Sequence, residues 1–147
     1  MLRSKPALLN VLVLSLAVGL TGYSSAQAAD DALFQGLVKQ GGIAALVDGY
    51  LEVCANDSRV GPVFAHSDIP HLREKLVEYI CVLSGGPCEY TGDPMDVVHG
   101  GLNITEAQFN AGVENLQEAM ARLNLPEATQ NRLLARLAPL RREIIYR

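Results

Sequence analysis

Residues 95–109, MDVVHGGLNITEAQF, decide the fold of this chain. The apolar turn from Met95 to His99 is short, and Gly100–Gly101 ends it. Thr105 and Gln108 then stand at the two positions of a capping box, the pattern that opens an α-helix. The stretch therefore predicts a short helix that carries a histidine, a glycine break, and the start of a long helix.

Apolar residues recur at helical spacing on both sides of this stretch. Before it, they predict a weak helix over Ala32–Gln40 and strong helices over Ile43–Cys54 and Pro70–Leu83. After it, they predict a helix from Thr105 to Leu123 and a last helix from Leu133 to Ile145 that Pro139 kinks or breaks. The predicted buried face of the first of these two helices is Phe109, Val113, Leu116, Met120 and Leu123. Strand signals are weak and no internal repeat is present. The expected fold class is therefore all-α, in one domain.

The composition of the 147-residue chain suits helices and excludes one class of partner. The formal net charge is -4, with acidic and basic residues interspersed, so the chain lacks the basic patch of a nucleic-acid-binding protein. It has no Trp and three Phe, and a core of Leu, Val, Ile and Ala suits packed helices better than packed sheets. We expect no nucleic-acid partner.

The N-terminal residues 1–28 are typical of a secretory signal peptide. A positively charged start precedes an apolar run from Ala7 to Leu20, and Ala26-Gln27-Ala28 supplies a cleavage site of the A-x-A type. The apolar run is short for a membrane span, which takes about 20 residues. We predict that residues 29–147 form a mature domain, exported to the periplasm and without a stable membrane span. An uncleaved N-terminal anchor is the alternative.

The three cysteines would lie in an oxidising compartment if the chain is exported. Cys81 and Cys88 are close in sequence and bracket a Gly-Gly turn, so a local disulfide is one alternative and free thiols are the other. Cys54 is expected as a buried free thiol on a helix. The spacing matches no zinc-binding pattern.

The three histidines are the candidate ligands for a metal or cofactor. His66 and His71 lie in polar company around a helix start, and we expect both at the solvated surface. His99 follows two valines and precedes two glycines, which let the backbone pass close to a bulky group. A neutral imidazole on a rigid turn is what haem iron takes as its proximal ligand. From the residues alone, His99 is either such a ligand or a satisfied core side chain.

Over about Leu33 to Ile145, several segments resemble the group I truncated haemoglobins, the two-on-two helical globins. These segments are Phe64-Ala65, Gly85-Gly86-Pro87 with Tyr90-Thr91-Gly92, Met95 to Thr105, and Leu137-Ala138-Pro139-Leu140. The resemblance implies a two-on-two helical sandwich that binds haem b, with His99 as the proximal iron ligand and with Phe64 and Met95 in contact with the haem. It also implies diatomic gas ligands: oxygen, nitric oxide and carbon monoxide.

The chain departs from this family on the ligand side of the haem. Most group I members carry a tyrosine on the second helix that points at bound oxygen, and a gapless count from Phe64 puts Leu51 at that position. Tyr50 occupies the position only if one residue is inserted. The facing helix offers Leu72 and Leu76, where polar side chains such as Gln often stand. We favour the gapless register, and so a largely apolar pocket.

Lys75 borders this apolar stripe and has two alternative roles. Some relatives place a side chain from this position on the iron, but lysine ligates only when deprotonated, and its ordinary pKa is about 10.4. We favour a stem that lies along apolar surface and an ammonium group that pairs with a haem propionate. His71 is a weaker candidate for the sixth iron ligand.

An apolar pocket suits gas binding, nitric oxide chemistry or redox sensing better than oxygen storage. A missing hydrogen bond of about 0.5 to 1.5 kcal/mol loosens oxygen binding roughly threefold to tenfold. Activity like that of a nitric oxide dioxygenase or a peroxidase would need an electron donor, which the sequence does not identify. Two alternatives stay open: a haem-free helical protein-interaction module outside the cytoplasm, and a haem- or metal-trafficking protein that uses His66, His71 and the thiols.

Overall fold

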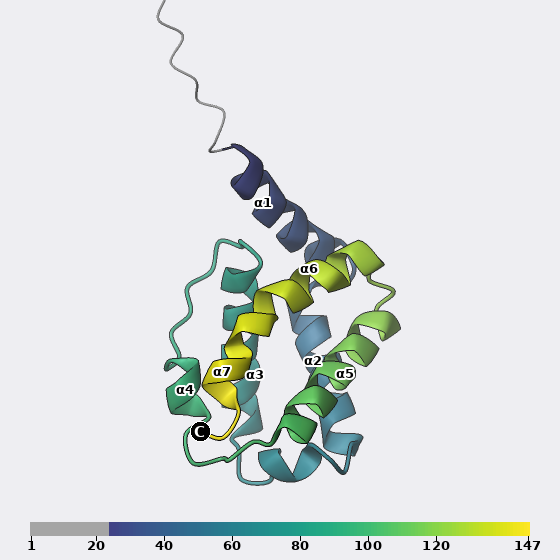
Figure 1. Cartoon of the computed structure of the whole chain (residues 1–147). Helices are drawn as coiled ribbons and strands as arrows, with labels where there is room; N and C mark the ends of the chain where they lie inside the picture. The colour runs from purple at the N-terminus through teal and green to yellow at the C-terminus, as the bar shows by residue number, and fades with distance from the viewer. Residues whose placement is uncertain (1–23) are drawn as a thin grey trace, which may run out of the picture.

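The computed structural model describes residues 24–147, with side chains from Ala32 onward. All regular elements of this part are helical, so the predicted all-α fold is confirmed (Figure 1). The α-helices are α1 (Ser24–Lys39), α2 (Gly42–Asn56), α3 (Ile69–Leu83), α4 (Met95–Val98), α5 (Glu106–Arg122), α6 (Glu127–Leu137) and α7 (Arg141–Ile144), and the 3₁₀ helices are η1 (Gly61–Phe64) and η2 (Ala138–Leu140). Most of the predicted signal peptide, residues 1–23, lies outside the described residues.

Local sequence explains how several helices begin and end. The side chain of Asp68 caps α3 by accepting a hydrogen bond from the backbone N–H of His71. Thr105 and Gln108 form both hydrogen bonds of the predicted capping box at the start of α5. Pro139 breaks the last predicted helix, because its ring clashes with the preceding turn and it has no N–H to donate. The 3₁₀ helix η2 therefore separates α6 from α7.

The first helix begins earlier than predicted. It starts at Ser24 instead of Ala32 and so includes the last residues that we assigned to the signal peptide. Gly41 and Gly42 follow it with φ angles of 101° and 89°, a left-handed region that glycine enters without a steric penalty. These two glycines allow the chain to turn sharply from α1 into α2.

The helices form the two-on-two arrangement around α2, which packs against α1, α3 and α5 (Figure 1). The main core lies between these helices and α6, and its buried members are Leu33, Leu37, Ile43, Leu46, Val47, Ile80, Cys81, Leu116, Ala119, Met120, Leu125 and Leu133. A smaller buried cluster of Cys54, Val60 and Ala111 lies at the other end of α2. In the part that the structure describes, we find no helix with the length and apolar character needed to cross a membrane.

The buried face of α5 is only partly the predicted one. Leu116 and Met120 are buried as predicted, but Phe109, Val113 and Leu123 are only half buried, and Ala111, Asn115 and Ala119 are buried as well. Small residues explain the difference, because they let α2 and α5 approach closely. A Cβ atom on Gly49 of α2 would lie 3.8 Å from the Cβ atom of Ala119.

Candidate functional site

His99 is half buried at the C-terminal end of α4. Its Nδ1 atom lies 2.7 Å from the carbonyl oxygen of Met95. A carbonyl oxygen only accepts hydrogen bonds, so Nδ1 carries the proton and Nε2 keeps a lone pair. Among the described residues, the imidazole of His99 has no other hydrogen-bond partner. Its imidazole is thus oriented by one nitrogen and free to coordinate through the other, which is how metal-binding histidines are commonly held.

Apolar side chains near the helices α3, α4 and α5 remain only half covered by the rest of the protein. They belong to neither buried cluster, and they are Leu72, Met95, Ile104, Phe109 and Val113. Leu76 and Phe64 are also half buried and lie at the edges of the two clusters. Half-covered apolar surface together with one free imidazole nitrogen suits a large apolar ligand with a metal at its centre.

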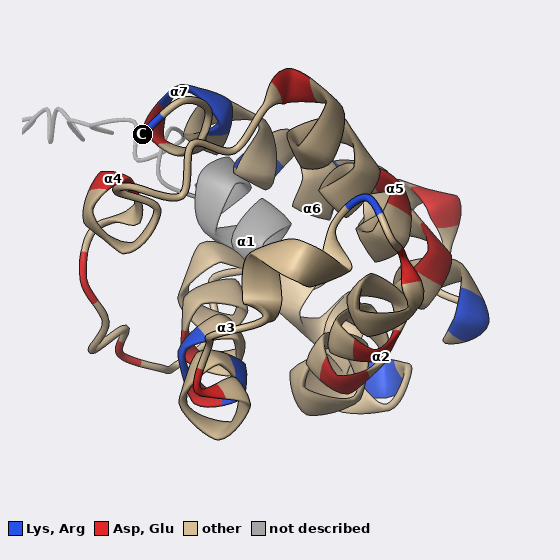
Figure 2. Cartoon of the chain, turned by 90° about the horizontal axis from the view of Figure 1, so that it is seen from below, with Lys and Arg blue, Asp and Glu red and all other residues tan. Residues whose placement is uncertain are grey.

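The extended segment 84–94 joins α3 to α4 (Figure 2), and side chains tie it to α3 at two points. Cys81 and Cys88 form a disulfide, which confirms that alternative. Farther along, the backbone N–H and the hydroxyl group of Thr91 each lie 2.9 Å from Oε2 of Glu78. These two ties hold the middle and the later part of the segment against α3, and so restrict where α4 can lie.

Lys75 belongs to the same ionic network. Its Nζ atom lies 2.9 Å from Glu74, 3.0 Å from Glu78 and 2.6 Å from the hydroxyl oxygen of Thr91. Hydrogen bonds to Glu74 and Glu78 raise the pKa of Lys75 above its ordinary value. The backbone N–H of Thr91, followed by Lys75, lowers the pKa of Glu78 to about 2. Lys75 is therefore a protonated ammonium group with three partners.

Sequence reasoning missed the partners of Lys75. Glu78 follows Lys75 by three residues on α3, a spacing at which helical side chains meet, so this pair could have been found. Thr91 is 16 residues away on an irregular segment, and no local signal points to it.

Leu51 and Tyr50 lie on different sides of α2. Asp48 forms an ion pair with Arg73 of α3 at 2.5 Å, which marks the side of α2 that faces α3. At about 100° per residue, Leu51 lies roughly 60° from Asp48 around the helix, whereas Tyr50 lies roughly 160° away. The Tyr50 hydroxyl is beside α5, 3.5 Å from where a Cβ atom on Gly112 would be. Leu51 is thus the one nearer to α3.

Tyr50 belongs to a polar cluster between α2 and α5. The sulfur of Cys54, a residue that is 1% exposed, accepts a hydrogen bond of 3.7 Å from Nδ2 of Asn115. Tyr50 packs against the same buried cluster. Burial, with a smaller effect of Cys54, raises the pKa of Tyr50 far above its ordinary value, and burial also raises the pKa of Cys54. Cys54 is the buried free thiol that we predicted, but its partners were not predicted.

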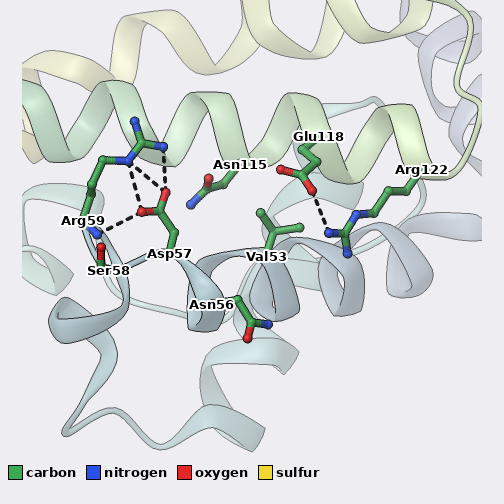
Figure 3. Close-up of a pocket in the computed structure, with 8 residues that line it drawn as sticks. All are labelled: Val53, Asn56, Asp57, Ser58, Arg59, Asn115, Glu118 and Arg122. Atoms are coloured by element: carbon green, nitrogen blue, oxygen red, sulfur yellow. Dashed lines mark hydrogen bonds and ion pairs between the residues drawn. The ribbon is translucent and has the colours of Figure 1, made fainter.

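A separate polar cleft lies where α2 ends against α5, with a volume of about 390 Å³ (Figure 3). Its charged groups are paired: Arg59 lies 2.8 Å from Asp57, and Arg122 lies 2.6 Å from Glu118. Hydrogen bonds from Arg59 lower the pKa of Asp57 to about 2. None of the site residues predicted from the sequence lines this cleft.

The other two histidines are exposed. His66 follows η1, and His71 lies in the first turn of α3. Within residues 32–147, no group of three or more His, Cys, Asp or Glu side chains is placed to hold a metal ion. Glu52 of α2 and Glu114 and Glu118 of α5 are exposed, and Figure 2 shows acidic residues on both helices.

Comparison with known proteins shows which family has this arrangement. The sequence profile of the family described as bacterial-like globin matches residues 32–146. The chain belongs to that family. Among its relatives, the group 1 truncated hemoglobin GlbN of Nostoc sp. (strain MUN 8820) is 37% identical over 89 residues, which cover 60% of this chain and 75% of that protein. GlbN of Mycolicibacterium paratuberculosis is 35% identical over 95 residues, which cover 65% of this chain and 69% of that protein.

Solved structures agree with the sequence relatives. The crystal structure of truncated hemoglobin from Tetrahymena pyriformis, Fe(III) form, superposes with a TM-score of 0.73 and 25% sequence identity, over 78% of this chain and 98% of that chain. The chain is therefore a truncated globin of group I, as its segments suggested, and it has the haem-binding function of a globin. The family binds diatomic gases.

Proposed function

We propose that this globin binds haem b on the half-covered apolar side, with Nε2 of His99 as the proximal iron ligand. One observation carries the proposal: the Met95 carbonyl holds the Nδ1 proton of His99 at 2.7 Å, which leaves Nε2 free. The haem supplies an iron that binds diatomic gases and exchanges single electrons. The protein supplies the imidazole, its orientation, and an apolar surface that excludes water.

The predicted pocket residues fit this role by position. Leu72 and Leu76 lie one turn apart on α3, and Leu51 lies on the side of α2 that is nearer to α3. Phe64 is the last residue of η1, precedes α3 in the chain, and is half buried. None of these four side chains carries a hydrogen-bond donor, so this side of the pocket is apolar.

Lys75 is proposed as a structural cation and not as an iron ligand. Ligation needs the neutral amine, and Glu74 and Glu78 raise the pKa of Lys75, so deprotonation costs more here than for a free lysine. An ammonium group that already has three partners ties α3 to segment 84–94. A haem propionate would have to compete with Glu78 for it.

The gas and the cellular role follow from the apolar pocket. Oxygen gains more than carbon monoxide or nitric oxide from a hydrogen-bond donor, and without one it binds roughly threefold to tenfold more weakly. We therefore propose nitric oxide chemistry or redox sensing in preference to oxygen storage, with an electron donor that is still to be identified. We further propose export to the periplasm after cleavage near residue 28, on the pattern of the N-terminal residues.

Replacing His99 tests the proximal ligand. We expect His99→Ala to lose haem during purification or to bind it weakly, while His71→Ala, a matched change at an exposed position of α3, keeps a normal Soret band. Added imidazole should restore the axial signature of His99→Ala, because it replaces the missing ligand. A His99→Ala protein that keeps its haem with an unchanged axial signature contradicts the assignment.

A further inference from the structure

The polar cluster between α2 and α5 has no role in the proposed haem site, although it contains the residue that could make that site polar. A tyrosine hydroxyl one helix position away from Leu51 is a potential donor to a bound gas. In this structure the Tyr50 hydroxyl points to α5, beside Gly112. The question is what keeps it there.

Cys54 lies one turn after Tyr50 on α2, so its sulfur is within reach of the phenol on the same helix face. Tyr50 packs against the buried cluster that contains Cys54, and hydrogen bonding to the Cys54 sulfur contributes to the raised pKa of Tyr50. Asn115 of α5 holds the sulfur from the other side through Nδ2, at 3.7 Å. Cys54 and Asn115 are 1% and 3% exposed, so solvent does not compete for these bonds.

We propose that Cys54 is a positioning residue that holds the Tyr50 phenol against α5, away from the α3 side of the pocket, and thereby keeps the ligand side of the haem apolar. The proposal rests on the proposed haem site, since it explains the polarity of that site. A buried hydroxyl group left without an acceptor costs free energy and turns towards any acceptor within reach. Without the Cys54 sulfur, a bound gas becomes an alternative acceptor for the phenol.

Two substitutions of Cys54 separate a positioning role from simple packing. Cys54→Val has a similar volume but no acceptor atom, whereas Cys54→Ser keeps an acceptor in the same place. Tyr50→Phe removes the donor, and the double variant Cys54→Val/Tyr50→Phe removes both. All four are compared by circular dichroism first, to establish that each is folded.

With haem bound, the readouts are the oxygen dissociation rate and the carbon–oxygen stretching frequency of the carbon monoxide complex. We expect Tyr50→Phe to match the wild type, because the phenol does not reach the ligand. Cys54→Val should slow oxygen dissociation about threefold to tenfold, the effect of one new hydrogen bond, and should lower the stretching frequency. Cys54→Ser and the double variant should both return to the wild-type values.

Two results overturn the proposal: a Tyr50→Phe protein that already differs from the wild type, or a Cys54→Val protein whose gas kinetics do not change. A haem-free measurement keeps this test separate from the test of function. The Raman doublet of tyrosine reports the hydrogen bonding of the phenol, and subtraction of the Tyr50→Phe spectrum isolates Tyr50. If the protein takes up no haem, the proposed function fails, but the positioning role can still be tested. That role requires Cys54→Val to change the tyrosine doublet and Cys54→Ser to leave it unchanged.

Discussion

The two sides of this molecule bury their apolar residues to very different extents. Between α1, α2, α5 and α6, residues such as Leu46, Met120 and Leu133 are at most 1% exposed. On the side of α3, α4 and the start of α5, Leu72, Met95 and Phe109 remain half buried. The first side completes its core with protein atoms alone. The second side lacks a partner of its own, which is the condition expected where a globin holds its haem.

The exposed valines of α4 extend this contrast. Val97 and Val98 are 59% and 43% exposed, and Leu102 after them is 46% exposed. Backbone hydrogen bonds still hold this region, because Tyr146 donates to Ile104 and Asn103 donates to Arg147. Backbone hydrogen bonds and the contacts among Lys75, Glu78 and Thr91 therefore hold the half-covered side in place. Its apolar side chains remain partly exposed and can contact a ligand.

The largest effect should come from truncating matched leucines on the two sides. In the haem-free protein, Leu133→Ala should lower the free energy of unfolding by about 2 to 5 kcal/mol, because it opens a cavity in a closed core. Leu72→Ala should cost less, about 1 kcal/mol, since part of that side chain is already in contact with water. Urea unfolding of both variants measures the difference.

The same pair sharpens the contrast when haem is added. A ligand that binds only the folded protein stabilises it, and Leu72→Ala weakens that binding directly. The deficit of Leu72→Ala should therefore grow with haem, while the deficit of Leu133→Ala stays nearly constant. Equal costs at the two positions without haem would remove the distinction between the two sides.

The next largest effect should come from the disulfide that joins the closed core to segment 84–94. Cys81 is 2% exposed, whereas Cys88 is exposed on the segment. Cys88→Ser should lower the free energy of unfolding by about 2 to 4 kcal/mol, the usual range for a native disulfide. Reductant should lower the melting temperature of the wild type to about that of Cys88→Ser, and should leave the melting temperature of the variant unchanged. A wild type that is insensitive to reductant would mean that the ionic network alone holds the segment.

The smallest effect should come from the ionic tie at Glu78. Its pKa is lowered to about 2 from an ordinary 4.5, so its ionised form adds stability that is complete above about pH 4.5 and is lost as the pH falls towards 2. Glu78→Gln should therefore lower the melting temperature slightly at pH 7 and match the wild type near pH 2. Glu89→Gln, at an exposed carboxylate on the same segment, is the control. A deficit that persists unchanged at pH 2 would argue against the ionic tie.

Much of this fold could be predicted because its signals are local. Hydrogen bonds within a few residues of each other explain the capping box of Thr105 and Gln108 and the break at Pro139. The disulfide spans seven residues and was foreseen as one of two alternatives. The burial of Leu116 and Met120 on α5 was predicted, but that of Ala111, Asn115 and Ala119 was not, because apolar periodicity cannot tell that small residues bring α2 and α5 together.

The amino-acid sequence alone determined the helices, their caps, the family, and the choice of His99 as the candidate ligand, since each rests on residue types at short spacing. Only the tertiary structure decided which side of α2 each residue faces, and hence that Tyr50 meets Asn115, a residue of α5, through Cys54. Asn115 and Cys54 are 61 residues apart in the chain. Contacts over such a separation depend on how helices pack, and packing is set by the whole core and not by any one segment.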